Sequence, residues 1–438
     1  MTATGLVIAA PASGSGKTIV TLGLLRACRR HGLSAGSAKV GPDYIDPRYH
    51  EAASGMPCTT LDGWAMRRDL IGELAGRAAR TVDLLIIEGV MGLYDGAPRA
   101  GPVSDGSTAG MAQMLGLPVV LVIDASRQGQ SVAATVHGFR TFRPGPTITG
   151  VILNRVSGPR HERLLRGALE RIDVPVFGAI PATDAIVVPS RHLGLVQAGE
   201  LAALERFLDA AATIVDGAVD LGALVAAAAP LPPGPAKATC TLPPPGQRIA
   251  LARDRAFGFA YEHLLDGWRA RGAEIAVFSP LADEPPPVHA DAVYLPGGYP
   301  ELHAGRLAAA SRFMSGLRAH ACAGHPVYGE CGGYMVLGSV LHDDRGAAHP
   351  MAGLLALETG MAGGRLSLGY RLATARGATP FAARGSVLRG HEFHHARVIR
   401  EDGDALFDLE DSTGTALGAV GLRSGSVFGS FFHVIDRG

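Results

Sequence analysis

A glycine-rich loop near the start of the chain constrains its fold most strongly. The loop, APASGSGKT at residues 10–18, follows an apolar segment and precedes a segment with helical spacing at 18–30. A strand that enters a helix through such a loop is the context of a Walker A motif. Backbone N–H groups of Gly14, Ser15 and Gly16 would surround phosphate oxygens at the positive end of the helix. We therefore expect a βα unit that binds a nucleotide.

Two side chains of this loop are predicted to carry chemistry. Lys17 can reach the outer phosphates, and the Thr18 hydroxyl can ligate magnesium. Pro11 stands where the standard pattern has its first glycine, a departure that suits a variant subclass of the motif. The alternative is a Gly/Ser turn before a helix, which the GKT sequence in this strand–helix context disfavours.

Further apolar runs indicate the fold class. Residues 84–88, 119–124 and 148–154 are too apolar for half-exposed strands and suit a parallel sheet that is covered on both faces. Their alternation with helix-like stretches predicts an α/β doubly wound domain. A second alternation of the same kind begins at residue 248.

A proline-rich stretch separates the two alternations. Seven prolines fall within residues 230–246, a density that permits neither a helix nor a central strand. We expect two doubly wound α/β domains: an N-terminal P-loop domain over 1–229 and a second domain over 248–438, joined by a linker at 230–247.

Acidic groups follow two of the predicted N-terminal strands. Glu88 ends the apolar run 84–88, as in a Walker B element, and would face the nucleotide crevice. Lys39, Asp43 and Asp46 lie in the segment KVGPDYIDP, where two carboxylates and an ammonium suit magnesium and phosphate handling. A solvated turn and a strand-terminal Glu are the alternatives, and the neighbouring P-loop disfavours both. Asn154 either hydrogen-bonds an adenine edge or forms a turn.

The second domain carries a predicted thiol site. In YGECGGYM, small residues flank Cys331, so the chain can turn sharply from a strand into a helix and expose the thiol, as in a nucleophile elbow. His433, in GSFFH, is the candidate base, and GHEFHH around His391 is a second candidate. The turn PGGYPE contains Gly298, whose N–H could stabilise an oxyanion. A buried structural cysteine is the alternative.

Composition excludes several function classes. The 40 Lys+Arg balance the 40 Asp+Glu, which argues against a nucleic-acid binder with a basic face. No apolar run of membrane-spanning length and no secretory signal are apparent, so we expect no membrane association. The five cysteines form no C-x-x-C pair and predict reduced thiols in the cytoplasm.

Longer motifs resemble a known family. PGGYPE, YGECGGYMVLG and SFFH resemble triad-class (class I) glutamine amidotransferase domains, and APASGSGKT, KVGPDYIDPRYHEAASG and EGVMGLYDG resemble the ATP-using domain of dethiobiotin synthetase-like enzymes. Together with GHEFHH and PSRHLGL at 189–195, they are similar to the cobyrinic and hydrogenobyrinic acid a,c-diamide synthases. The resemblance covers the chain except for the linker.

The resemblance implies an ATP- and glutamine-dependent ligase that amidates two carboxylates of a corrin acid through acyl phosphates, in cobalamin biosynthesis. It implies Cys331 as nucleophile, His433 as its base, and magnesium as cofactor. Many amidotransferases carry Glu two residues after that histidine, where this chain has Ile435, so the third member of the site is absent or supplied differently. A homodimer is left open. The remaining implied residues are Gly298 and Gly332 for the oxyanion and Thr18, Asp46 and Glu88 for magnesium.

The acceptor must approach the outer phosphate of ATP from the same edge of the sheet. We therefore hypothesise that Asp43, Tyr44 and Asp95 bind the corrin side chain, although Asp95 alternatively stabilises its own glycine-rich loop. Competing functions within the enzyme class are cobyric acid synthase and nickel-sirohydrochlorin a,c-diamide synthase. A ParA-like switch ATPase with an inactive amidotransferase-like module is the competitor from another class.

Overall fold

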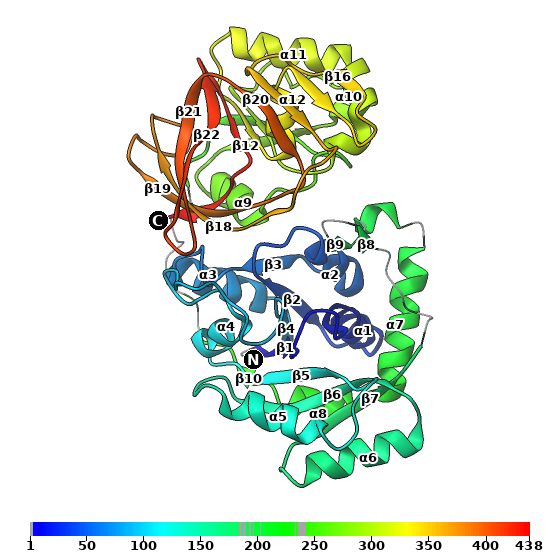
Figure 1. Cartoon of the computed structure of the whole chain (residues 1–438). Helices are drawn as coiled ribbons and strands as arrows, with labels where there is room; N and C mark the ends of the chain where they lie inside the picture. The colour runs from blue at the N-terminus through cyan, green and yellow to red at the C-terminus, as the bar shows by residue number, and fades with distance from the viewer. Residues whose placement is uncertain are drawn as a thin grey trace. The chain divides into compact units, whose positions relative to one another are not determined.

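A computed structural model describes residues 3–183, 186, 190–191, 194–195, 197–201, 203–232, 234 and 242–438. The chain divides into two compact units, Met1–Thr239 and Cys240–Gly438 (Figure 1). Each unit is built on its own large sheet flanked by helices, and each is described separately below.

The sheet of the N-terminal unit is parallel, as its apolar strands predict. Its strand order is β3-β2-β4-β1-β5-β6-β7, and the short β10 pairs antiparallel with β1. The strands are β1 (Thr4–Ala9), β2 (Ala35–Val40), β3 (Cys58–Leu61), β4 (Leu84–Glu88), β5 (Val119–Asp124), β6 (Ile148–Val156), β7 (Val176–Pro181) and β10 (Ala229–Pro230); Ser190–Arg191 (β8) and Gly194–Leu195 (β9) form a separate pair.

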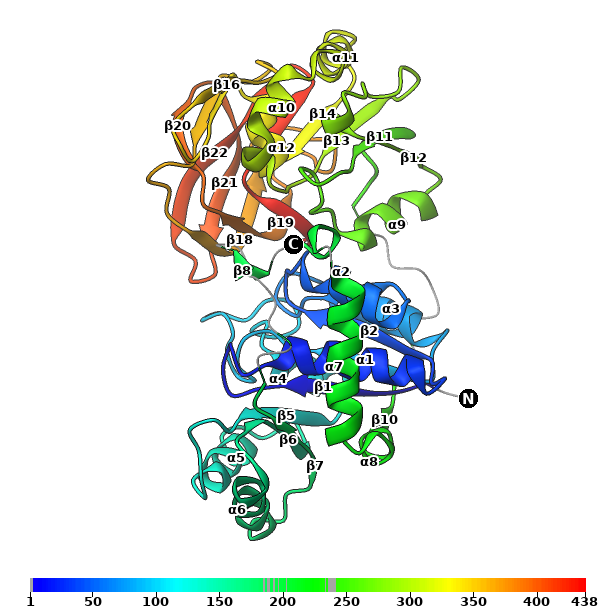
Figure 2. The same ribbon diagram turned by 90° about the vertical axis from the view of Figure 1, so that its right-hand side faces the viewer.

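Helices connect these strands. They are α1 (Lys17–Arg30), α2 (Asp46–Ser54), α3 (Arg68–Ala79), α4 (Thr108–Leu115), α5 (Val132–Thr141), α6 (Pro159–Glu170), η1 (Ala198–Glu200), α7 (Leu204–Ala218) and α8 (Leu221–Ala226). Helix α7 packs across α1 (Figure 2). The two helices approach closely at Gly23, where a Cβ atom would come within 2.9 Å of the Ala211 carbonyl oxygen. A 3.0 Å ion pair between Arg26 and Asp209 also joins them.

The strand order places the nucleotide loop where ligands bind in such sheets. The connection after β1 leads through α1 to β2 on one side, whereas β5, β6 and β7 lie on the other side of β1. A crevice opens at the carboxyl ends of the strands at this kind of reversal. The loop after β1 and the ends of β2, β4 and β6 all meet at this edge of the sheet.

The C-terminal unit combines a parallel half-sheet with an antiparallel half. Its described strands form a ten-stranded sheet in the order β12-β11-β13-β14-β23-β22-β21-β18-β19-β24, parallel from β12 to β23 and antiparallel beyond. They are β11 (Arg248–Ala252), β12 (Glu274–Phe278), β13 (Ala292–Leu295), β14 (Val327–Glu330), β18 (Ser367–Ala375), β19 (Val387–His394), β21 (Asp404–Asp411), β22 (Ala416–Ser424), β23 (Val427–Ser430) and β24 (His433–Arg437).

A smaller four-stranded sheet and several helices complete this unit. The small sheet contains β15 (Val340–His342), β16 (Ala348–Pro350), β17 (Leu357–Gly360) and β20 (Arg397–Glu401). The helices are α9 (Glu262–Ala270), η2 (Pro280–Ala282), η3 (Pro300–His303), α10 (Ala304–Ala309), α11 (Ser311–Cys322) and α12 (Gly332–Leu337).

The predicted α/β class is confirmed for both units. The strands predicted at 84–88 and 119–124 have the observed bounds, the strand predicted at 148–154 extends to Val156, and the second alternation begins with a strand at residue 248, as expected. The antiparallel half and the small sheet are additions that the sequence did not predict.

The proline-rich linker stays a prediction, because residues 233 and 235–241, with Cys240, lie outside the described residues. At its start Pro230 pairs with Thr4. In the PSRHLGL motif, Pro189, His192 and Leu193 also lie outside them. The four described cysteines are free thiols. No helix among the described residues is long and apolar enough to span a membrane.

Candidate active sites

The phosphate loop has the backbone that its glycines allow. Gly14 and Gly16 adopt φ angles of +79° and +95°, in the left-handed region that favours glycine. The side-chain amide of Asn154 occupies the space that a Cβ atom on Gly16 would need. A residue with a side chain at Gly16 would therefore strain the backbone and displace Asn154 as well.

The two functional side chains of the loop contact groups on the neighbouring strand and its loop. The buried Lys17 ammonium donates a hydrogen bond to the backbone carbonyl of Met91. Burial lowers the pKa of Lys17, although the nearby Glu88 carboxylate raises it in part. The Thr18 hydroxyl donates to Glu88 Oε1 over 2.6 Å. The lone pairs of the Thr18 oxygen thus stay available to a metal.

Glu88 is the buried centre of this site. Its side chain is fully shielded from solvent, and Oε1 accepts a second hydrogen bond from Lys39 Nζ at 2.8 Å. Its Oε2 lies 2.6 Å from His50 Nε2. Burial by itself would raise the pKa of Glu88, but Lys39 and His50 together hold it well below its usual range. Glu88 is therefore a carboxylate.

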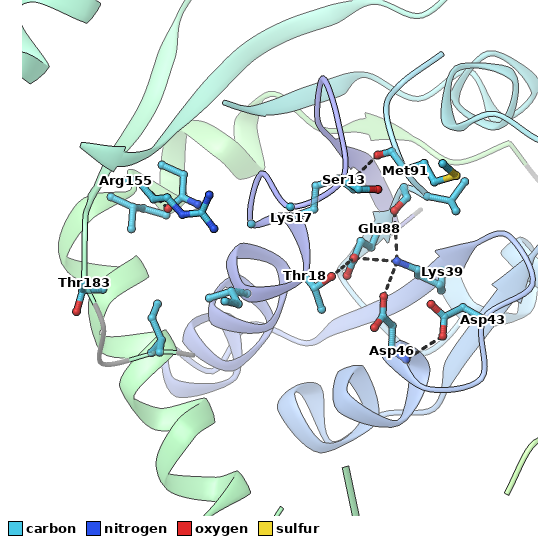
Figure 3. Close-up of a pocket in the computed structure, with 18 of the residues that line it drawn as sticks. Ser13, Lys17, Thr18, Lys39, Asp43, Asp46, Glu88, Met91, Arg155 and Thr183 are labelled. Carbon is cyan, nitrogen blue, oxygen red and sulfur yellow. Dashed lines mark hydrogen bonds and ion pairs between the residues drawn. The ribbon is translucent and has the colours of Figure 1, made fainter. Parts of the chain in front are cut away.

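Lys39 links the two predicted metal carboxylates. Its Nζ lies 2.7 Å from Asp46 Oδ2, as well as contacting Glu88, and Figure 3 shows it between them. Burial lowers the pKa of Lys39, but the carboxylates of Asp46, Glu88 and Asp43 outweigh this effect and raise it. Burial and the Asp43 charge raise the pKa of Asp46 to about 7, with Lys39 opposing them.

Sequence reasoning did not single out His50, which lies on α2 in the motif KVGPDYIDPRYH. Its Nδ1 is 3.5 Å from the sulfur of Cys58, and its Nε2 contacts Glu88. Burial opposes protonation of His50, but Cys58 and Glu88 raise its pKa to about 10. A charged imidazolium therefore helps to hold the Glu88 carboxylate in place.

The donors at this site fit magnesium. Asp46 and Glu88 supply carboxylate oxygens and Thr18 supplies a hydroxyl, which are the hard ligands that Mg²⁺ prefers. Among the described residues, no group of three or more His, Cys, Asp or Glu side chains is arranged to hold a metal. One or two carboxylates together with nucleotide phosphates form the usual magnesium site of such loops, and this donor set matches that arrangement.

A cavity of about 760 Å³ opens over these groups. The predicted residues on its wall are Gly14, Gly16, Lys17, Thr18, Lys39, Asp43, Asp46, Glu88 and Asn154, and Met91, Arg155 and Thr183 join them (Figure 3). Its volume is within the usual range for a small-molecule pocket. The cavity thus unites the loop after β1 with the ends of β2, β4 and β6.

The thiol site lies at the turn between β14 and α12. Cys331 adopts φ +47° and ψ −104°, a strained conformation for a residue with a side chain, and its N–H donates to the Ser430 carbonyl over 2.8 Å. A Cβ atom on Gly332 would lie 3.1 Å from the Gly298 nitrogen and 2.7 Å from Pro300 Cδ. The turn therefore brings the two predicted oxyanion glycines together beside the nucleophile.

His433 lies against this turn at the start of β24. The thiol of Cys331 is within hydrogen-bonding reach of its ring. A Cβ atom on Gly297 would be 2.5 Å from His433 Cε1, so the PGG turn has to be glycine here. Burial lowers the pKa of His433, but Cys331 and Glu330 raise it to about 9. The cysteine and histidine expected from the sequence thus form one pair.

Glu330, the residue directly before the cysteine, was not predicted. Its carboxylate is buried, with Oε2 3.6 Å from His433 Nδ1. Oε2 also accepts a hydrogen bond from the Tyr294 hydroxyl at 2.9 Å, and Oε1 accepts one from the Val434 N–H at 3.2 Å. A Glu at the end of a buried strand, directly before a candidate nucleophile, is the sequence signal that identifies it.

The second histidine cluster stands beside this pair. The His391 ring stacks on His433 with centroids 4.9 Å apart and planes 10° apart, and its Nε2 is 2.9 Å from the Tyr261 hydroxyl. Burial and the nearby His433 lower the pKa of His391 well below its usual value. His391 is therefore a neutral neighbour of His433.

Comparison with known proteins identifies the family. Residues 6–196 match the CobQ/CobB/MinD/ParA nucleotide binding domain, and residues 248–437 match the CobB/CobQ-like glutamine amidotransferase domain. Hydrogenobyrinate a,c-diamide synthase from Brucella abortus is 55% identical over 99% of this chain and 98% of its own length. The chain belongs to the hydrogenobyrinate a,c-diamide synthase family. Two further members are those of Rhodobacter capsulatus, 52% identical over 98% of both chains, and Mesorhizobium japonicum, 49% identical over 100% of this chain and 99% of its own.

In this member of the hydrogenobyrinate a,c-diamide synthase family, three predicted ligand-binding residues make local contacts. Asn154 Nδ2 donates to the Ser15 carbonyl over 2.9 Å. Asp43 Oδ1 accepts the N–H groups of Ile45 and Asp46 at 2.8 and 3.1 Å and so shapes the turn before α2. Asp95 Oδ2 accepts the N–H of Gly92 at 2.8 Å, which is the loop-stabilising alternative. Tyr44 is largely buried. Their contacts with ATP or a corrin stay predictions.

Proposed function

We propose that this chain is a glutamine-hydrolysing ligase that uses ATP to convert the a and c carboxylates of hydrogenobyrinic acid, a metal-free corrin, into amides. One observation carries the proposal: a P-loop site with buried carboxylates and a Cys–His site occur in one chain, whose full length resembles relatives named for this reaction. The same names favour hydrogenobyrinic acid as the acceptor over the acceptors of a cobyric acid synthase or a nickel-sirohydrochlorin a,c-diamide synthase. A glutamine amidotransferase domain disfavours a ParA-like switch.

The first step activates a corrin carboxylate. A carboxylate oxygen attacks the γ-phosphorus of ATP, so that a new P–O bond forms while the bond to the ADP oxygen breaks. The product is an acyl phosphate, which has the good leaving group that a carboxylate lacks. The buried Lys17 ammonium lies at the phosphate loop and would offset negative charge as two anions approach.

Thr18, Asp46 and Glu88 would hold magnesium, which supplies further charge neutralisation at the phosphates when it is bound. Lys39 and His50 contribute indirectly, because their contacts fix both oxygens of Glu88. Glu88 in turn orients the Thr18 hydroxyl through their 2.6 Å hydrogen bond.

The second step releases ammonia from glutamine. The sulfur of Cys331 attacks the side-chain amide carbon after His433 takes the thiol proton, and the oxyanion is stabilised by the N–H groups of Gly298 and Gly332. His433 then gives the proton to the departing ammonia. A thioester remains, and water hydrolyses it to glutamate and the free thiol.

Ammonia then displaces phosphate from the acyl phosphate and forms the amide. At neutral pH free ammonia is mostly protonated and is not a nucleophile. We therefore propose that it passes from one site to the other without release into the solvent. A cytoplasmic setting, where thiols stay reduced, fits the free Cys331. The homodimer stays a hypothesis.

Product masses test the proposal. The purified chain is supplied with ATP, magnesium and glutamine, and with either hydrogenobyrinic acid or its cobalt-containing counterpart. We expect ATP-dependent formation of a monoamide and then a diamide from the metal-free acid. No amide from either acid, or amidation that proceeds without ATP, would contradict it. Faster conversion of the cobalt form would contradict only the choice of corrin.

A further inference from the structure

A buried carboxylate lies next to the candidate base. Glu330 is only 2% exposed, and its Oε2 is 3.6 Å from His433 Nδ1. The residue two positions after this histidine, Ile435, is apolar and buried. A carboxylate from β14 therefore stands next to the ring, whereas the position on β24 that usually supplies one in such sites does not provide it.

We propose that Glu330 is the positioning residue of the glutaminase site, which holds His433 with its Nδ1 protonated and its Nε2 directed at Cys331. This inference rests on the proposed function, because it concerns the step that releases ammonia. Glu330, which directly precedes the nucleophile, would supply the carboxylate that Ile435 does not provide.

The contacts of Glu330 fix the carboxylate in one orientation. The Tyr294 hydroxyl donates to Oε2 over 2.9 Å, and the Val434 N–H donates to Oε1 over 3.2 Å. Both donors come from strands of the large sheet, β13 and β24. A buried carboxylate is costly unless it is hydrogen-bonded and paired with a cation. His433, the next residue to Val434, is the basic group that Glu330 meets.

This arrangement also selects the tautomer of the base. A neutral imidazole carries one proton, and a carboxylate beside Nδ1 keeps the proton there. Nε2 is then unprotonated and can accept the thiol proton of Cys331, which is within hydrogen-bonding reach of the ring. When the imidazolium forms, the negative charge of Glu330 stabilises it. These are the two tasks of the acid in other nucleophile–base–acid sites.

The other titratable and charged groups around His433 leave this task to Glu330. His391 stacks on the ring from β19, and burial and His433 keep it neutral. Burial likewise lowers the pKa of His394. Arg371 is paired with Glu392 over 2.7 Å. Other ionisable groups near the pair are Cys331 at the turn, Tyr294 and Tyr328 beside Glu330, and Tyr261 beside His391.

Glu330→Gln tests the proposal, because it preserves shape and removes the charge. We expect glutamine-dependent amidation to fall by at least about tenfold, since general-base catalysis contributes on the order of 10²–10⁴-fold. The KM for glutamine should change much less than kcat. Amidation driven by high ammonia should stay at the wild-type rate, because it bypasses Cys331. Ammonia-driven amidation also reports on the proposed function independently of Glu330.

A second readout separates positioning from a structural role. The rate at which iodoacetamide alkylates Cys331 is measured against pH, with Cys331→Ala as the blank for the other thiols. Without the negative charge, the imidazolium is less stable and the thiolate forms less readily. We expect the alkylation midpoint of Glu330→Gln to move to higher pH, and that of Glu330→Asp, which keeps the charge, to lie between it and the wild type.

The matched control is Glu358→Gln. Glu358 Oε1 lies 2.6 Å from His342 Nε2 in the same unit, so this variant removes another His–Glu pair, a partly exposed one on the small sheet. We expect wild-type glutaminase activity and an unchanged alkylation profile. The proposal is overturned if Glu330→Gln keeps wild-type glutamine-dependent activity and profile, if Glu358→Gln matches its losses, or if Glu330→Asp shows no recovery. Loss of ammonia-driven amidation in Glu330→Gln would also overturn it, because the role would then be structural.

Discussion

Replacing Glu88 by Gln perturbs a buried group that has three side-chain partners in the nucleotide site. The carboxylate is fully buried and meets Lys39 at 2.8 Å, His50 at 2.6 Å and Thr18 at 2.6 Å. The neutral amide of the Gln variant cannot compensate the charges of Lys39 and His50. Its NH₂ group would also have to face another hydrogen-bond donor. Removal of one partner of a buried ion pair costs about 3–5 kcal/mol.

The predicted effects of Glu88→Gln are therefore large and confined to one unit. For a unit of the size of Met1–Thr239, the unfolding temperature should fall by roughly 6–20 °C, at about 2–4 °C per kcal/mol. Amidation from glutamine and from ammonia should both be lost, because the site loses a carboxylate that is proposed to hold magnesium. Glutaminase activity at Cys331 should persist, since that site lies in the other unit.

Thermal unfolding of the full chain, monitored with and without nucleotide, measures this effect. The control is Glu205→Gln, which removes an exposed partner of Arg26, with 67% of the Glu205 side chain accessible, and should cost about 0–1 kcal/mol. An unfolding temperature and an ammonia-driven rate for Glu88→Gln within the error of the wild type would refute the reasoning that Glu88 organises the site.

Three other predictions follow from the two sites. Cys331→Ala should abolish glutamine-dependent amidation and spare the ammonia-driven rate, whereas Lys17→Ala should abolish both; equal loss of both rates in Cys331→Ala would contradict the division of labour. The pKa of His433 is raised from 6.5 to about 9, so its pairing stabilises the folded state fully below pH 6.5 and this stabilisation is lost as the pH rises through about 9. The difference in unfolding temperature between the wild type and His433→Asn should therefore shrink over this range, and a constant difference would count against the pairing. Tyr44→Ala and Asp95→Asn should impair amidation with little change in ATP affinity, and a loss of ATP binding of about tenfold (about 1.4 kcal/mol) with intact corrin affinity would reassign either residue.

Strands with continuous apolar runs were predictable from the sequence. Residues 84–88 and 119–124 have the predicted bounds because a strand covered on both faces contains little besides apolar side chains. In the antiparallel strands, polar residues interrupt the apolar ones in β18 and two glycines interrupt them in β22. Partly exposed residues and glycines make up much of them, so their pattern resembles that of loops.

The site residues that could be predicted lie in local sequence motifs, whereas those that were missed are defined by tertiary contacts. Lys17 and Cys331 are identified by the turns that flank them. The roles of His50 and Glu330 become evident only in the folded chain, where a carboxylate or an imidazole from a distant segment contacts them. Asn154 was predicted either to hydrogen-bond an adenine edge or to form a turn; its amide donates to the carbonyl of the distant Ser15, and its contact with adenine stays a prediction.

Transfer of label from glutamine tests the central claim most directly. Glutamine carrying ¹⁵N in its side-chain amide is supplied with ATP, magnesium, hydrogenobyrinic acid and an excess of unlabelled ammonium at neutral pH. The account predicts a diamide with ¹⁵N at both new amides, and one ADP and one glutamate for each amide formed. A diamide that carries mostly unlabelled nitrogen, or glutamate release without amide formation under these conditions, would contradict it.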